Sequence, residues 1–273
     1  PAGAADAHLG QEIGIRFRGP GGNDTLLRYV DNVRLDHYSS DIADGSFSTD
    51  WNTDNRVWPG PGYWGNRLQD WEVRNNRVNC IHTSKPRRTL HRTTTGIRGN
   101  GGDFTFTVNT GLANGTNSFG ARTGFLIGAG PNLDWRASLL VHDGLGRDFG
   151  TFLGIANTGA TVIENLSGGS IKPVATGANP GNFPTTARLK LTGIYDNKTG
   201  QYALTIQSLA ANGNLISQAT TSVPSHRVLG SFGLFSHRGS SGTGFWFDDF
   251  TGSGSALEPH PGRNLAFIGA LHS

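Results

Sequence analysis

The amino-acid sequence predicts an all-β protein, a two-sheet antiparallel β-sandwich (jelly roll) with almost no helix. The chain has 273 residues, with 41 Gly, 12 Pro and only 16% charged residues, which is typical of many short strands joined by tight turns. No long segment places apolar residues at i, i+3, i+4 and i+7, the spacing of a helix face. Two segments, 29–35 (Tyr-Val-Asp-Asn-Val-Arg-Leu) and 245–250 (Phe-Trp-Phe-Asp-Asp-Phe), alternate apolar residues around an acidic centre. Each therefore has the pattern of a β-strand.

The first 37 residues are predicted to form two strands and a loop. Residues 12–17 and 26–35 alternate, and the Gly-rich residues 19–24 separate them. Two strands cannot bury a core by themselves. This segment is therefore expected to complete an upstream domain, to pack on the main domain, or to pair with another copy of the chain.

The main domain is predicted to span residues 38–255 and to form one sandwich, followed by a linker or C-terminal tail at 256–273. Gly, Asn and Asp clusters mark its turns, and the clearest is the hairpin that joins Tyr195 to Gln201. More than ten short strands without helices require two packed sheets. The expected strands are residues 71–74, 77–83, 88–94, 103–110, 118–128, 135–143, 150–157, 160–164, 186–195, 201–209, 215–222, 231–237 and 244–251.

Composition and charge limit the compartment and the partners. A single cysteine, Cys80, excludes an intrachain disulfide, and no apolar run is long enough to span a membrane. The chain has no Met and begins with Pro, which favours a processed fragment. It has few Cys and Lys and many Asn, Gly and Thr, which favours a secreted, extracellular bacterial protein. The net charge of +3 is too small to predict a nucleic-acid partner. The densest basic run, residues 85–88, favours a solvated loop between two strands.

An aromatic cluster gives the candidate carbohydrate site. Several Trp and Tyr residues lie in or beside the Pro/Gly-rich segment 58–65, and an exposed ring offers a flat apolar face on which a sugar can stack. The alternative is that the loop folds over one end of the sandwich and its rings fill the core. The candidate residues are Trp58, Tyr63, Trp64 and Trp71 for stacking, with Asn66, Arg67 and Asp70 for recognition of hydroxyl groups.

The acidic pair Asp248 and Asp249 suggests a calcium site. Neighbouring side chains of a strand point to opposite faces, so one carboxylate is expected to face inward or toward a sheet edge and to need a partner. Calcium takes carboxylate and carbonyl oxygens, and Asp44 near the first strand of the domain is the expected second ligand beside Asp249. The alternative is that Asp248 pairs with an arginine or caps a turn.

Catalytic residues are not evident. The chain has only four Glu residues and lacks the Glu-x-Asp-x-(x)-Glu strand motif of jelly-roll glucanases. Alternation places Arg136 and His142 on one face, next to Asp143, which is the nearest arrangement to a lyase site, although a lone His is more often structural. The sequence therefore does not assign an activity, and it favours a non-catalytic protein.

Several motifs resemble known families. The segments 44–51 (Asp-Gly-Ser-Phe-Ser-Thr-Asp-Trp) and 245–250 resemble the bracketing motifs of concanavalin A-like lectin and glucanase sandwiches. Residues 58–73, 124–128 and 245–250 are also similar to the sandwich that precedes the catalytic domain of alkaline-phosphatase-D-like metallophosphoesterases, and residues 258–265 look like the junction to it. The phosphatase metal-binding motifs are absent. The segment 10–35 resembles the end of a secreted galactose-binding-like domain.

These resemblances imply a secreted, non-catalytic carbohydrate-binding module, part of a larger extracellular protein, with a polysaccharide or glycan as its partner and calcium as a structural ion. Two alternatives are a structural subunit that self-assembles by strand addition through residues 1–37, and a polysaccharide-cleaving enzyme.

Overall fold

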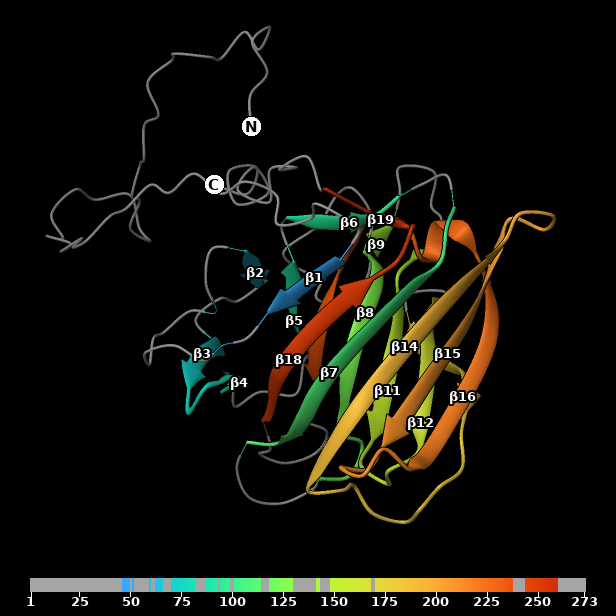
Figure 1. Ribbon diagram of the computed structural model, residues 1–273. Coiled ribbons are helices and arrows are strands. Elements are labelled where there is room, and N and C mark those ends of the chain that lie inside the picture. Colours follow the sequence, from blue (N-terminus) through green and yellow to red (C-terminus); the bar gives the residue numbers. More distant parts are fainter. Residues whose placement is uncertain are drawn as a thin grey trace, which may run out of the picture. The chain divides into compact units, whose positions relative to one another are not determined.

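The computed structural model shows two antiparallel sheets packed face to face (Figure 1). The predicted jelly-roll sandwich is confirmed. Helical geometry among the described residues is limited to the 3-10 turn η3 (Ser225–Arg227) and to Asp70. No described helix has the length and apolarity needed to cross a membrane. The structure describes residues 46–49, 51, 59, 62–65, 70–81, 87–92, 94–98, 101–113, 118–129, 141–142, 148–167, 170–237 and 244–259.

The eight-stranded sheet contains the longest strands and forms the front layer in Figure 1. Its order is β16-β15-β14-β7-β18-β4-β3, and β1 also pairs with β18. The first described strand, β1, is therefore a neighbour of β18, near the C-terminal end of the sandwich. The bounds are β1 (Ser46–Thr49), β3 (Trp71–Arg74), β4 (Arg77–Cys80), β7 (Phe104–Leu112), β14 (Thr186–Asp196), β15 (Gln201–Leu209), β16 (Leu215–Pro224) and β18 (Phe245–Ser253).

The seven-stranded sheet lies behind it, in the order β13-β12-β11-β8-β17-β5-β2. Its strands are β2 (Tyr63–Gly65), β5 (Arg88–Arg92), β8 (Arg122–Ala129), β11 (Thr151–Ala156), β12 (Thr161–Ser167), β13 (Ser170–Thr176) and β17 (Ser231–His237). Two small sheets pair β9 (Val141–His142) with β10 (Asp148–Phe149), and β6 (Thr95–Ile97) with β19 (Leu257–Pro259).

Aromatic rings fill the space between the sheets. Phe106 from the eight-stranded sheet stacks on Phe232 from the seven-stranded sheet, with ring centroids 4.4 Å apart. Phe47 of β1 meets Phe250 of β18 edge to face at 5.1 Å. Such pairs add stability beyond the burial of apolar area, so the ring contacts hold both layers and the closing strand pair together.

The predicted strands and turns agree with the structure in most places. The hairpin between Tyr195 and Gln201 is present, with Asp196 paired to Gln201, and β17 has the predicted bounds. The prediction missed β13, which carries Pro173. Proline suits a strand only at a sheet edge, at its first residue or at a bulge, and β13 is the edge strand of its sheet.

The predicted end of the sandwich at residue 255 is wrong. Leu257–Pro259 form β19 and pair with β6, and Ala256 and Leu257 are buried in the core. These apolar side chains continue the sandwich beyond the expected boundary. The predicted segment 1–37 lies outside the described residues, and its role stays a prediction.

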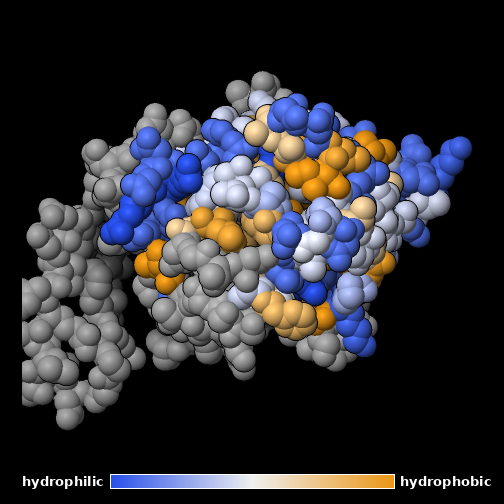
Figure 2. Space-filling view, turned by 90° about the horizontal axis from the view of Figure 1, so that it is seen from below, coloured by the Kyte–Doolittle hydropathy of each residue, from blue (hydrophilic) through white to orange (hydrophobic). Residues whose placement is uncertain are grey.

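The surface of the described sandwich is mixed. Seen from below, hydrophobic residues form several separate patches among hydrophilic ones (Figure 2). The exposed large hydrophobic side chains among the described residues are Ile81, Phe119, Val174, Ile194 and Leu215. Scattered apolar residues of this kind are normal on a protein surface, so they do not by themselves indicate an interface.

Candidate functional site

Two of the four predicted stacking residues belong to the core. Trp71 is fully buried, and its ring lies 6.1 Å from that of Phe247. Tyr63 is 7% exposed, and its hydroxyl donates to Thr49 Oγ1 at 2.6 Å. The predicted stacking of sugars on Tyr63 and Trp71 is therefore wrong, because neither ring offers a free face. The alternative that the rings fill the core holds for both.

The structure describes only some of the other predicted residues. Trp58, Asn66 and Arg67 lie outside the described residues, and Trp64 is described only through its backbone in β2. Asp70 is buried and forms an ion pair with Arg88. Its carboxylate therefore has a structural partner and is turned away from a ligand at the surface.

The basic run at 85–88 is not a solvated loop at its described positions, Arg87 and Arg88, because both are buried. Arg88 pairs with Asp70. Arg87 donates to Glu164 Oε2 at 2.6 Å, across 77 residues of sequence. The prediction failed because a local charge run does not reveal partners that only folding brings together.

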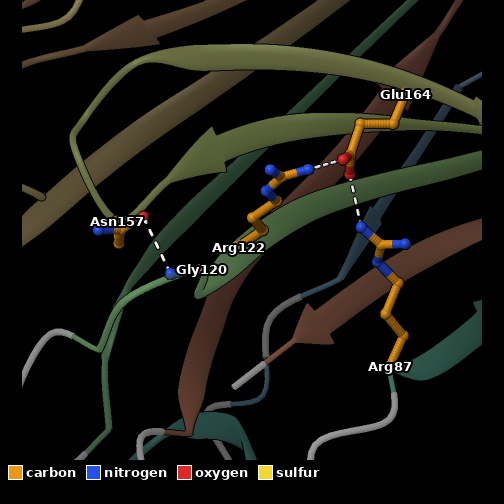
Figure 3. Close-up of polar contacts among 5 residues, drawn as sticks. All are labelled: Arg87, Gly120, Arg122, Asn157 and Glu164. Atoms are coloured by element: carbon orange, nitrogen blue, oxygen red, sulfur yellow. Dashed lines mark hydrogen bonds and ion pairs between the residues drawn. The ribbon is translucent and has the colours of Figure 1, made fainter. Parts of the chain in front are cut away.

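Glu164 on β12 lies between two arginines. Arg87 contacts one carboxylate oxygen and Arg122, from β8, contacts the other (Figure 3). The Glu164 side chain is 1% exposed, whereas the Arg122 side chain is 28% exposed. The guanidinium of Arg87 also lies 4.7 Å from the ring centroid of Phe152. Burial, and repulsion from Arg122, lower the pKa of Arg87.

This ionic cluster lies on the face of the seven-stranded sheet that points away from the core. Along β11, Leu153 and Ile155 belong to the core, whereas Phe152, opposite Glu164, does not. A buried carboxylate that satisfies both oxygens with arginines is a structural unit whose loss is costly. The cluster is therefore assigned to stability.

The acidic pair on β18 does not follow simple alternation. Asp249 has a φ of 50°, and a register shift between Asp248 and Thr251 marks a β-bulge. The extra residue lets Phe247 and Phe250 both point into the core, while Asp249 is exposed and Asp248 half-buried. The expectation that one carboxylate faces inward is wrong, because the bulge changes which residues share a face.

The described residues do not by themselves form a calcium site. Asp249 accepts a hydrogen bond from Asn109 Nδ2 at 2.7 Å, and Asp248 accepts from the backbone N–H of Asp249 at 2.9 Å, which agrees with the turn-capping alternative. Within the described ranges, no group of three or more His, Cys, Asp or Glu side chains is placed to hold a metal ion. Asp44 lies outside those ranges, so the calcium prediction is untested.

The nearest candidate catalytic arrangement is also untested. Arg136 and Asp143 lie outside the described residues, and His142 is described only through its backbone in β9.

A cleft of about 670 Å³ lies on the opposite side of the sandwich, on the outer face of the eight-stranded sheet. Strands β4, β18, β7 and β14 form its floor, and the β15–β16 turn forms one wall. Outward-facing side chains of paired strands meet there, since Arg188 is opposite Asn109 and Asn109 is opposite Asp248. The lining residues are Arg77, Thr107, Asn109, Thr186, Ala187, Arg188, Lys190, Leu209, Ala210, Ala211, Gly213, Trp246 and Asp248.

The cleft combines charge with hydrogen-bonding groups. Arg77 lies over the Trp246 ring at 4.0 Å from its centroid, which holds the guanidinium in place. The lining contains three cationic side chains, those of Arg77, Arg188 and Lys190, and one carboxylate, that of Asp248. Guanidinium, ammonium and amide groups donate hydrogen bonds to hydroxyl, carboxylate or sulfate oxygens. The cleft can therefore hold a polar ligand with many oxygens. Sequence reasoning missed it because these residues come from distant strands.

Comparisons with solved structures identify the fold. Lectin I from Ulex europaeus, solved with the methyl glycoside of α-L-fucose, superposes with a TM-score of 0.53 and 10% sequence identity. The alignment covers 77% of this chain and 98% of the lectin chain. The carbohydrate recognition domain of Emp47p has a TM-score of 0.51 at 12% identity and covers 78% and 96%.

The carbohydrate-binding module CBM66 from Bacillus subtilis is also similar, with a TM-score of 0.46 at 14% identity, and covers 70% and 95%. At such low identity, the first two likenesses establish the fold alone. The predicted jelly-roll sandwich fold is thereby confirmed, and the resemblance to the phosphoesterase-associated sandwich stays a prediction. No protein-family model matches the chain, and a search of curated proteins gave no match.

Proposed function

We propose that the chain is a non-catalytic glycan-binding sandwich whose ligand occupies the cleft on the outer face of the eight-stranded sheet. The observation that carries this proposal is the cleft itself, a concave site with a few convergent polar groups. The structures that share the fold supply the ligand class, because their names describe lectins and carbohydrate-recognition domains.

The charge of the cleft favours acidic glycans. Three cationic side chains face one carboxylate in the lining, so a uronic acid or sulfate group would replace their hydration with charge-assisted hydrogen bonds. We expect polygalacturonate and heparin to bind more tightly than dextran, and the difference to shrink as salt screens the exposed charges.

The test is glycan binding by the intact chain and by matched variants. Arg188→Ala removes a cleft cation and should weaken binding about tenfold or more, since a hydrogen bond to a charged group contributes about 1.5–3 kcal/mol. Lys172→Ala, an exposed cation on β13 of the other sheet, is the control and should bind as the parent does.

The same assay separates the cleft from the predicted aromatic loop. If Arg188→Ala binds normally and Trp64→Ala does not, the cleft is the wrong site and the loop of Trp58, Trp64, Asn66 and Arg67 is the right one. Repeating the assay with a chelator tests the proposed calcium ion. If a folded protein binds none of the three polymers, the glycan proposal is rejected and the structural-subunit alternative is favoured. Secretion from a bacterial cell and membership of a larger extracellular protein are part of the same proposal.

A further inference from the structure

Two rows of polar side chains cross the outer face of the eight-stranded sheet beside the cleft. Strand register aligns one hydroxyl residue from each of β16, β15, β14, β7, β18 and β1 in the first row. These are Thr220, Thr205, Thr192, Thr105, Ser253 and Ser46. All are half-buried or exposed, so the row lies at the surface of the sheet.

The second row runs parallel to the first and lies two residues away from it on each strand. Its members are Gln218, Gln207, Lys190, Thr107, Thr251 and Ser48. They too are half-buried or exposed. The two rows together form a continuous polar surface, which we call the polar rows.

Hydrogen bonds between neighbours order the polar rows. Thr205 and Thr220 lie 3.1 Å apart between their Oγ1 atoms, Thr107 and Thr251 lie 2.7 Å apart, and Gln207 donates to the Gln218 carbonyl at 2.7 Å. A hydroxyl can donate one bond and accept two, so each paired group keeps capacity for a ligand. Threonine is also stiff at χ1, which lowers the entropy lost when a ligand binds.

The polar rows continue the cleft. Lys190 and Thr107 belong both to the second row and to the cleft lining. Neighbouring strands are about 4.8 Å apart, so a row from β16 to β1 extends roughly 24 Å, which is long enough for several linked sugars. A ligand that leaves the cleft would meet a regular series of donors and acceptors.

We propose that the polar rows are an extension of the glycan site, and that the protein takes an extended polysaccharide chain lying across the strands, with several consecutive sugars in contact. This inference rests on the proposed function. A site for one terminal sugar would need only the cleft. The polar rows add hydrogen bonds to internal sugars, so affinity should increase with chain length.

The experiment compares the binding polymer of the panel with its own oligosaccharides of increasing length, down to the monosaccharide. In the parent protein, affinity should rise with each added sugar until the rows are filled. The double variant Thr192→Val/Thr205→Val removes two hydroxyls and keeps the β-branched shape. It should lose about tenfold in affinity for the polymer, since each neutral hydrogen bond contributes about 0.5–1.5 kcal/mol, and bind the monosaccharide as before.

Thr176→Val, at an exposed position of β13 in the other sheet, is the matched control. The inference is overturned if monosaccharide and polymer bind with equal affinity, or if the double variant binds the polymer as this control does. Either result would leave the cleft as the proposed glycan site. A chain that binds no glycan of any length would overturn the proposed function as well, so the two failures are distinguishable.

Discussion

On the outer face of the seven-stranded sheet, Glu164 is buried between Arg87 and Arg122. On the outer face of the eight-stranded sheet, Arg188 is exposed and Lys190 half-buried, beside a cleft. The first group of charges is paired within the chain, which links the two strands β8 and β12 to the segment before β5. The second group has donors directed at solvent. The number of arginines therefore does not locate a binding surface. What matters is whether each cationic side chain is already paired with a carboxylate of the same chain.

The largest expected effect comes from breaking the buried cluster. Glu164→Gln would leave two arginines facing each other without a carboxylate, and removing one partner of a buried ion pair costs about 3–5 kcal/mol. We expect the free energy of unfolding, measured in urea, to fall by that amount. Glu258→Gln, at an exposed position of β19, should change it by less than about 0.5 kcal/mol. Equal, small changes in both variants would show that Glu164 is not structural.

A smaller effect is expected from His91, another buried group of the seven-stranded sheet. Burial lowers its pKa to about 3, so the folded state keeps it neutral while the unfolded state binds a proton below about pH 6.5. Stability is therefore lost as the pH falls from 6.5 toward 3. Between pH 7 and pH 5 the loss is about 2 kcal/mol.

The measurement is the free energy of unfolding at both pH values for the parent and for His91→Gln. The loss of unfolding free energy between pH 7 and pH 5 should be about 2 kcal/mol smaller in the variant than in the parent, because only the other titratable groups then contribute to it. Parallel curves for the two proteins would count against the assignment.

The smallest effect is expected on the open face. Thr107→Val removes the hydrogen bond to Thr251, which is 2.7 Å long and half-buried. Its loss should cost about 0.5–1 kcal/mol, far less than Glu164→Gln, and thermal unfolding can resolve it against Thr176→Val. A loss as large as that of Glu164→Gln would show that the open face supports the fold as strongly as the buried cluster does.

The sequence predicted what depends on local pattern. Alternation and turn chemistry located the Tyr195 to Gln201 hairpin and β17, because both signals lie within a few residues. Alternation failed at Asp248 and Asp249, since a bulge inserts a residue and shifts the face of those that follow. It also failed at Pro173, which an edge strand tolerates.

The candidate site was harder to predict because its residues are distant in sequence. Arg188, Asn109 and Asp248 meet only through strand register, and the same is true of the partnership between Arg87 and Glu164. Trp71 illustrates the opposite error. Its place beside a Pro/Gly-rich segment suggested exposure, whereas Trp71 begins β3 with its ring in the core.

Strand β13 has a consequence for behaviour at high concentration. It is the edge strand of its sheet, and its centre carries Lys172 and Pro173. Proline has no N–H to offer an incoming strand, and a charged neighbour disfavours close approach of a second chain. This edge is thus a poor template for intermolecular β-sheet growth, so the protein should resist fibril formation there even at high concentration.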